Sequence, residues 1–336
     1  MKAAIFKEDE RLVVEEVPDP TPEPDEIVMR VTYCAICGSD LHRYAYGMLS
    51  PGTIMGHEFS GVVVATGKNV TGWKIGDRVT RCGGRIDPGR DLPNMPPRYS
   101  AKERGFLGMK PGAYAQYLAT PAEKVMAIPE GVSDLDSSLL EPLTVAVHAV
   151  RSSKLKLGDS VVVIGAGPIG LLVQQCARRA GATQVFVSEP NPARRRAAEI
   201  LGAQAVFHPE RTHVVQEIVK QTGIGADVAF ECGGAKPTLQ QALELVRMGG
   251  QVVLVALAWE PVDCLPVEWV GREVELKSVY AHLNSEWLVS MGLLVSGEVQ
   301  TQPLISKVIE LERLDQTFRE LLDPGNELVQ VVVKCN

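Results

Sequence analysis

The stretch VVVIGAGPIG, residues 161–170, sets three glycines between a run of β-branched residues and an apolar segment. The glycines follow the pattern GxGxxG. In a turn from a strand to a helix, they permit a tight bend, close approach of the backbone to a pyrophosphate, and close packing of helix on strand. The pattern therefore predicts a dinucleotide-binding unit. The residues expected to bind the cofactor in this loop are Gly165, Gly167, Pro168, Ile169 and Gly170.

An acidic residue follows at the distance that such a unit requires. Glu189 ends the next apolar run, 24 residues after Gly165, where a carboxylate accepts the ribose hydroxyls. Because this carboxylate would repel a 2′-phosphate, we expect NAD rather than NADP. Arg194, the first of three consecutive arginines, is a candidate cofactor-binding residue. A guanidinium can bind a 2′-phosphate, but we favour an exposed helical face or an arginine that stacks on the adenine. The alternative is a glycine-rich turn that binds nothing.

Beyond this loop, strand-like and helix-like segments alternate from Leu157 onward. The strand-like runs are nearly continuous in apolar residues, which is typical of strands buried on both faces. They are SVVVIG, TQVFVSEP, AQAVFH, ADVAFECGG and GGQVVLVALA. The alternation predicts a parallel, doubly wound sheet. A sixth strand is expected within REVELKSVYAH, residues 272–282.

The first 130 residues or so differ, because their short strand-like runs are bounded by Gly, Pro and Asp and show almost no helical periodicity. An apolar helix is expected to end near Val150. Near the C-terminus, ELVQVVVK, residues 327–334, could form a strand that returns to the first domain. We therefore predict a β-rich domain over residues 1–150, completed by about 285–336, and a dinucleotide-binding domain over residues 151–284.

Composition excludes several classes of function. A net charge of −7 argues against nucleic-acid or anionic-membrane binding as the main task. The longest run of apolar residues, Gly and Pro, Val161–Val173, is shorter than the roughly 18 residues needed to span a bilayer. The opening residues lack an apolar signal core. Seven scattered cysteines, an odd number, do not form a disulfide framework. We expect a cytoplasmic protein.

The stretch TYCAICGSDLH, residues 32–42, places Cys34 and Cys37 three residues apart. That spacing suits a redox dithiol, a zinc knuckle or two unrelated thiols. A redox pair would be expected at the start of a helix in a βαβ unit, and a knuckle would need two more cysteines nearby. We interpret Cys34 as a buried filler and seek the partners of Cys37 elsewhere.

Those partners are candidate metal ligands. His57 and Glu58 occur in GHEFSG, and Glu141 occurs in LLEPLTVAVHA. Thiolate, imidazole and carboxylate are the ligands of catalytic zinc, which keeps a further position open. Each residue alone also has an ordinary explanation, as core cysteine, hydrogen-bonded histidine or helix-end glutamate. Together with a dinucleotide-binding unit they predict a catalytic zinc site.

Five motifs carry a resemblance to a known family. CGSDLH, GHEFSG, GDRV, LLEPLTVAVHA and VVVIGAGPIG resemble the zinc-dependent medium-chain dehydrogenase/reductase family, and the polyol and diol branch of its alcohol dehydrogenases. The resemblance implies a GroES-like catalytic domain packed against a doubly wound Rossmann domain. It also implies hydride transfer between NAD and a secondary alcohol, diol or polyol, or the matching ketone. A homodimer or homotetramer through the edge strand of the Rossmann sheet is implied as well.

The resemblance also assigns roles to the candidate ligands. Cys37 and His57 would bind zinc, and Glu58 would be a ligand or an exchangeable neighbour. Glu141 would take the place of the third ligand, directly or through a water.

Three further residues would support the metal. Asp40 would accept the second ring N–H of His57 and fix its tautomer. Ser39 and His42 would relay the proton from the bound alcohol to solvent. Without the resemblance, Ser39 is a helix cap and His42 a surface residue.

The chain also departs from the family. Relatives hold a structural zinc with four cysteines, whereas residues 82–117 keep only Cys82, so we expect one zinc per chain. The Arg–Tyr pair of polyol-oxidising relatives is replaced by Ala281 and His282. Two other interpretations stay open, a zinc-free quinone or enone reductase and a non-catalytic nucleotide-binding relative.

Overall fold

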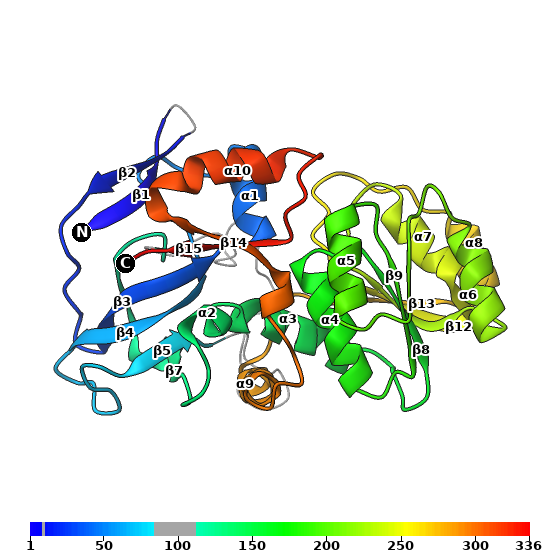
Figure 1. The fold of residues 1–336 in the computed structure, drawn as a ribbon, viewed down its shortest axis with the longest axis horizontal. Coiled ribbons are helices and arrows are strands. Elements are labelled where there is room, and N and C mark those ends of the chain that lie inside the picture. The colour runs from blue at the N-terminus through cyan, green and yellow to red at the C-terminus, as the bar shows by residue number, and fades with distance from the viewer. Residues whose placement is uncertain (9–10, 84–111) are drawn as a thin grey trace.

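The computed structural model describes residues 1–8, 11–83 and 112–336. Two large sheets lie toward opposite ends of the molecule, and helices α3 (Leu140–Arg151) and α4 (Pro168–Arg179) lie between them (Figure 1). Within the described ranges, every helix is too short or too polar to cross a membrane.

The first sheet is parallel and has six strands in the order β10-β9-β8-β11-β12-β13. Its strands are β8 (Ser160–Ile164), β9 (Gln184–Ser188), β10 (Ala205–Phe207), β11 (Ala226–Glu231), β12 (Val246–Leu254) and β13 (Glu275–Ser278). Besides α4, its helices are α5 (Pro192–Ile200), α6 (Val214–Thr222), α7 (Thr238–Leu245) and α8 (Pro266–Gly271). The predicted doubly wound sheet and its sixth strand are confirmed. The strand order reverses between β8 and β11, where such sheets bind ligands at the carboxyl ends of their strands.

The second sheet joins both ends of the chain. Its order is β14-β15-β3-β4-β5-β7, with β6 also paired to β3. Its strands are β3 (Glu26–Ala35), β4 (Glu58–Thr66), β5 (Arg78–Arg81), β6 (Tyr117–Pro121), β7 (Val125–Ala127), β14 (Ile305–Glu310) and β15 (Gln330–Lys334). Cys34 on β3 lies opposite Val333 on β15, so the C-terminal strand returns to the first domain as predicted.

The remaining elements are smaller. They are the hairpin of β1 (Lys2–Phe6) and β2 (Leu12–Glu16), helices α1 (Gly38–Ala45), α2 (Asp134–Ser137), α9 (Trp287–Val295) and α10 (Leu314–Leu322), and the 3₁₀ turns η1 (Ala122–Lys124), η2 (Asn284–Glu286), η3 (Gln302–Leu304) and η4 (Leu311–Arg313). Ser133 caps α2 by accepting from the backbone N–H of Asp136.

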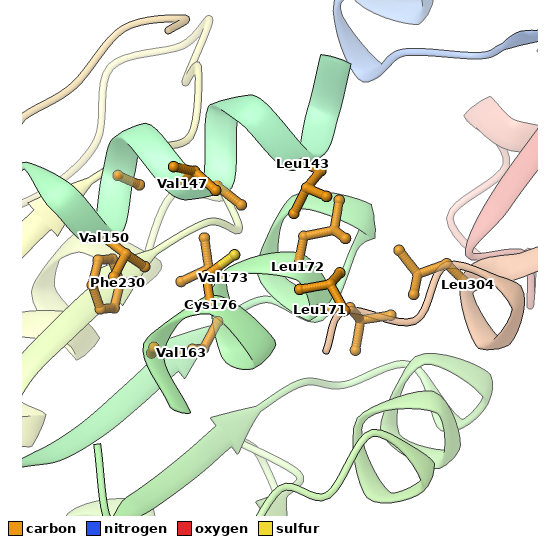
Figure 2. Close-up of a cluster of buried hydrophobic side chains, with 14 of the residues drawn as sticks. Leu143, Val147, Val150, Val163, Leu171, Leu172, Val173, Cys176, Phe230 and Leu304 are labelled. Atoms are coloured by element: carbon orange, nitrogen blue, oxygen red, sulfur yellow. The ribbon is translucent and has the colours of Figure 1, made fainter. Parts of the chain in front are cut away.

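A core of buried apolar side chains packs α3 against the parallel sheet and its helix α4. Leu143, Val147 and Val150 of α3 face Leu172 and Cys176 of α4, and each is buried (Figure 2). Burial of such apolar side chains stabilises the packing by about 1.5–3 kcal/mol each. Helix α3 carries Glu141 in its first turn, so this core fixes the position of that carboxylate relative to the nucleotide-binding sheet.

Three expectations stay predictions. The domain boundaries at residues 150 and 284 are sequence-based. Strand β13 is an edge strand of the parallel sheet, but whether a second copy pairs with it is untested. The expected lack of a structural zinc concerns residues 82–117, most of which, 84–111, lie outside the described residues.

Candidate metal centre and cofactor loop

Strand pairing brings the candidate ligands together. Strands β3 and β4 are antiparallel, and Ala35 at the end of β3 lies opposite Glu58 at the start of β4. Cys37 is two residues past Ala35, and His57 immediately precedes Glu58. One ligand atom each from Cys37, His57 and Glu58 lies within 4.8 Å of the others. The register of two strands thus places residues twenty positions apart at one point.

Cys37 is also the N-cap of α1. Its Sγ accepts from the backbone N–H of Ser39 at 3.4 Å and from Ser39 Oγ at 3.2 Å. A helix N-terminus and hydrogen-bond donors favour a thiolate. Burial and the neighbouring Glu58 nevertheless raise the pKa of Cys37 to about 11. A nearby cation would reverse this balance and deprotonate the thiol.

Glu58, like Cys37, is a buried acidic group whose charged form has too little stabilisation nearby. The residue is 2% exposed, and within the described part of the chain its Oε2 has no hydrogen-bond partner. Burial, followed by the charge of Glu141, raises the pKa of Glu58 to about 8. A buried carboxylate oxygen without a donor, beside a thiol and an imidazole, matches the ligand set of zinc. The residues present therefore fit a zinc ion.

Asp40 lies behind His57, where the resemblance placed it. Its Oδ1 is 3.4 Å from His57 Nδ1, and its Oδ2 accepts a hydrogen bond from the Tyr114 hydroxyl at 2.8 Å. Arg81 Nη1 donates to the carbonyl of His57 at 2.9 Å. Burial alone would lower the pKa of His57, but Asp40 and Cys37 raise it well above the usual value. The imidazole is thus held from both its ring and its backbone. Tyr114 carried no recognisable pattern in the sequence.

Glu141 stands outside the group of three ligand atoms but close enough for its charge to act on Glu58. Its Oε1 lies 3.2 Å from Nε2 of His282, which comes from the connection between β13 and α9. Burial would raise the pKa of Glu141, but the hydrogen bond and neighbouring positive groups, His282 first, lower it to about 2. The sequence marked His282 only as a departure from relatives.

Ser39 and His42, the expected proton relay, lie one turn apart on α1. The ring of His42 packs against Trp259 at 5.5 Å between centroids, and Tyr46 stacks on the same indole at 6.0 Å. Trp259 follows β12, so these rings join α1 to the connection that leaves β12 of the parallel sheet. Burial lowers the pKa of His42. The relay role of Ser39 and His42 stays a prediction.

The three loop glycines meet different constraints. Gly165 has φ +88°, and a Cβ there would lie 2.7 Å from Gly233 Cα. A Cβ on Gly170 would lie 1.9 Å from the carbonyl oxygen of Gly165. Gly167, the N-cap of α4 just before Pro168, has nothing within 4 Å of a built Cβ. Packing requires the first and third glycines, whereas the space beside the second is open to a ligand at the helix N-terminus, which fits a cofactor pyrophosphate.

Glu189 lies against this loop and is 3% exposed. Its carboxylate accepts from the backbone N–H of Ala166 at 2.6 Å and of Asn191 at 2.7 Å. Arg194 Nε donates to the carbonyl of Leu328 at 3.3 Å. The acid is therefore beside the glycines as expected, and the guanidinium of Arg194 reaches the C-terminal connection. The cofactor contacts of both residues, and of Ile169, stay predictions.

Comparison with known proteins gives consistent results. Residues 23–130 match the alcohol dehydrogenase GroES-like domain, and residues 168–295 match the zinc-binding dehydrogenase model. The chain is 34% identical to (R,R)-butanediol dehydrogenase of Bacillus subtilis (strain 168), covering 100% of both chains. The crystal structure of 2R,3R-butanediol dehydrogenase from Bacillus subtilis is similar with a TM-score of 0.87 and 33% identity, covering 100% of this chain and 99% of that one. A putative zinc-binding dehydrogenase from Sinorhizobium meliloti 1021 bound to NADP gives a TM-score of 0.85 and 29% identity, covering 99% and 98%.

Proposed function

The chain belongs to the zinc-dependent medium-chain alcohol dehydrogenase family, with a GroES-like and a Rossmann-like part, and on that premise we propose its detailed reaction. It is an oxidoreductase that acts on alcohols. We propose that it transfers hydride between NAD and a secondary alcohol of the diol or polyol type, or the matching ketone. The relative's name, butanediol dehydrogenase, favours a vicinal diol.

The observation that carries the proposal is the convergence of Cys37, His57 and Glu58, whose ligand atoms lie within 4.8 Å of one another. We propose that these three residues hold a single catalytic zinc. Glu141, bound by His282, would complete the site from α3, directly or through a water. When bound, zinc would act as a Lewis acid on the alcohol oxygen while the nicotinamide accepts the hydride.

The chain's own side chains would then handle the proton and orient the ligands. Asp40 would keep His57 in one tautomer by accepting from Nδ1. The Ser39 hydroxyl, which donates to the Cys37 sulfur in this structure, would turn to accept the proton of the alcohol as it passes its own proton to His42. His42 lies half-buried, and its lowered pKa makes it a neutral base near pH 7 that can receive this proton.

We propose NAD as the cofactor. The Glu189 carboxylate lies beside the glycine loop, at the end of β9, where a 2′-phosphate would meet a negative charge. The relative from Sinorhizobium meliloti is described as bound to NADP, so both cofactors must be compared. A higher kcat/KM with NADP than with NAD would contradict this part of the proposal.

Metal analysis and a panel of alcohols test the reaction. We expect about one zinc per chain and reduced nicotinamide formed from secondary diols, followed by its absorbance. Full turnover by a metal-free preparation would favour the zinc-free reductase. Bound zinc without substrate-dependent reduction, over a panel that includes vicinal diols and sugar alcohols, would favour the non-catalytic nucleotide-binding protein.

A further inference from the structure

The connection between β13 and α9 is fastened to α3 at two points, each a histidine–glutamate pair. His282 Nε2 lies 3.2 Å from Glu141 Oε1, and His148 Nδ1 lies 3.0 Å from Glu286 Oε1. Glu141 and His148 are seven residues apart on α3, two helical turns, and therefore lie on one face. The helix supplies the acid in the first pair and the base in the second.

The two pairs differ in how well their polar atoms are satisfied. Glu286 accepts a further hydrogen bond from the backbone N–H of Leu283 at 2.7 Å, as expected of an anchor. In the described part of the chain, Nδ1 of His282 is buried without a partner, so the ring makes its polar contact with Glu141 alone. An unsatisfied buried nitrogen costs stability. Anchoring the connection does not account for such a side chain, because the second pair already does this.

The position of His282 is tightly constrained. The residue is 2% exposed, and its ring stands edge-on against Trp287 at 4.8 Å and 79°. The residue before it, Ala281, has φ +52°, a left-handed conformation that is unfavourable for a residue with a side chain. Strain of this kind persists where the surrounding structure fixes a functional geometry. Backbone strain and ring packing both aim Nε2 at Glu141.

We propose that His282 is a positioning residue of the metal centre. Its Nε2–H binds Oε1 of Glu141 and fixes the rotamer of that side chain, so that Oε2 is left for the metal or its water. This deepens the proposed function and rests on it, since Glu141 needs such orientation only if Cys37, His57 and Glu58 hold zinc beside it. Mutation of a residue that orients a ligating carboxylate in this way typically weakens metal binding by about 10–100-fold.

The test compares His282→Leu, His282→Gln and a matched control, His148→Leu, in the metal-free full chain. Zinc affinity is measured by competition with a chromophoric chelator, without any turnover assay. Leucine removes the donor at similar volume, whereas the glutamine amide can donate from nearly the place of Nε2. We expect His282→Leu to bind zinc about 10-fold more weakly and His282→Gln to stay within about threefold of the unchanged protein.

The control breaks the other pair on the same connection. We expect His148→Leu to lower the melting temperature yet leave zinc affinity unchanged. The affinity of each variant for NADH, measured by fluorescence, shows whether that variant is folded. Equal zinc affinity in His282→Leu and the unchanged protein would overturn the inference, as would an equal loss in His148→Leu. If the unchanged protein bound no zinc at all, the proposed function itself would fail.

Discussion

Replacing Gly167 and Gly170 by alanine separates packing from cofactor binding in the glycine loop. At Gly170 a Cβ would lie 1.9 Å from the Gly165 carbonyl oxygen, about 1.1 Å inside the 3.0 Å limit of real Cβ contacts. The obstacle is backbone, so α4 must move away from the end of β8. Overpacking of this kind costs about 1–3 kcal/mol, and each kcal/mol lowers the melting temperature by about 2–4 °C in domains of 150–250 residues.

Gly167→Ala is the matched variant. Gly167 has φ −67°, which alanine adopts freely, and nothing lies within 4 Å of the added Cβ. Exchanging glycine for alanine at this N-cap should cost no more than about 1 kcal/mol. The methyl group would, however, occupy the space into which a pyrophosphate must come. Loss of one charged hydrogen bond, about 1.5–3 kcal/mol, raises the dissociation constant at least about tenfold.

Melting curves without cofactor and NADH fluorescence titrations provide the two measurements. We expect Gly170→Ala to lower the melting temperature before any ligand is added, and Gly167→Ala to weaken NADH binding with little change in melting. Unchanged NADH affinity in Gly167→Ala would refute the assignment of this space to the cofactor and support a turn that binds nothing. An unchanged melting temperature in Gly170→Ala would refute the packing argument.

Further predictions concern the metal, the two neighbouring cysteines and a surface ion pair. Removal of metal by chelation should abolish turnover while NADH still binds, and readded zinc should restore the rate; activity that survives complete chelation would contradict the metal mechanism. Cys34→Ser should retain zinc and turnover, at a stability cost of about 1–3 kcal/mol for burying a hydroxyl in a fully buried apolar site, whereas Cys37→Ser should lose both; equal losses would revive a paired role. Burial would raise the pKa of Asp227, but hydrogen bonds from Ser160 and then Arg247 lower it below its usual value of 3.8. The ionised Asp227 therefore stabilises the folded protein above pH 3.8, and this stabilisation is lost as the pH falls through the lower pKa of the folded state. At pH 7 the free energy of unfolding of Asp227→Asn should therefore be lower than that of the unchanged protein, by at most about 1 kcal/mol at this partly exposed site. In acid the two proteins should be equally stable; a difference in stability that persists there would exclude ionisation of Asp227 as its cause.

Local pattern predicted most of the parallel sheet, because buried strands read as continuous apolar runs and glycines mark the turn after β8. The boundaries were less predictable. The run expected as a strand from Gly249 begins at Val246, since α7 ends at Leu245 and passes directly into extended backbone at Val246. Helical periodicity and strand-like residues overlap in these few positions, and tertiary pairing with β11 decides between them.

In the metal centre, residue types were predictable and most of their partners were not. Thiol, imidazole and carboxylate side chains can be recognised in a sequence as candidate metal ligands from their chemistry alone. Tyr114 under Asp40, His282 against Glu141 and Trp259 over His42 are contacts between segments 74 or more residues apart. No periodicity or spacing links such residues, because the contact exists only once the sheets are in place. Ala281 and His282 could be noticed as a departure, but their role required the fold.

The place of β15 between β14 and β3 has a consequence for biosynthesis. During translation the strands of the parallel sheet, residues 160–278, emerge as one continuous block and can pair while the chain is still growing. Strand β3 must wait for Val333, some 300 residues later, before its own sheet is complete. Contacts of such long sequence separation form slowly. Although β6 pairs with the first half of β3, until β15 arrives the end of β3 from Tyr33 to Ala35 presents an unpaired edge that favours aggregation. Loss of the last seven residues, 330–336, would therefore harm the half of the molecule made first, the half that carries Cys37, His57 and Glu58.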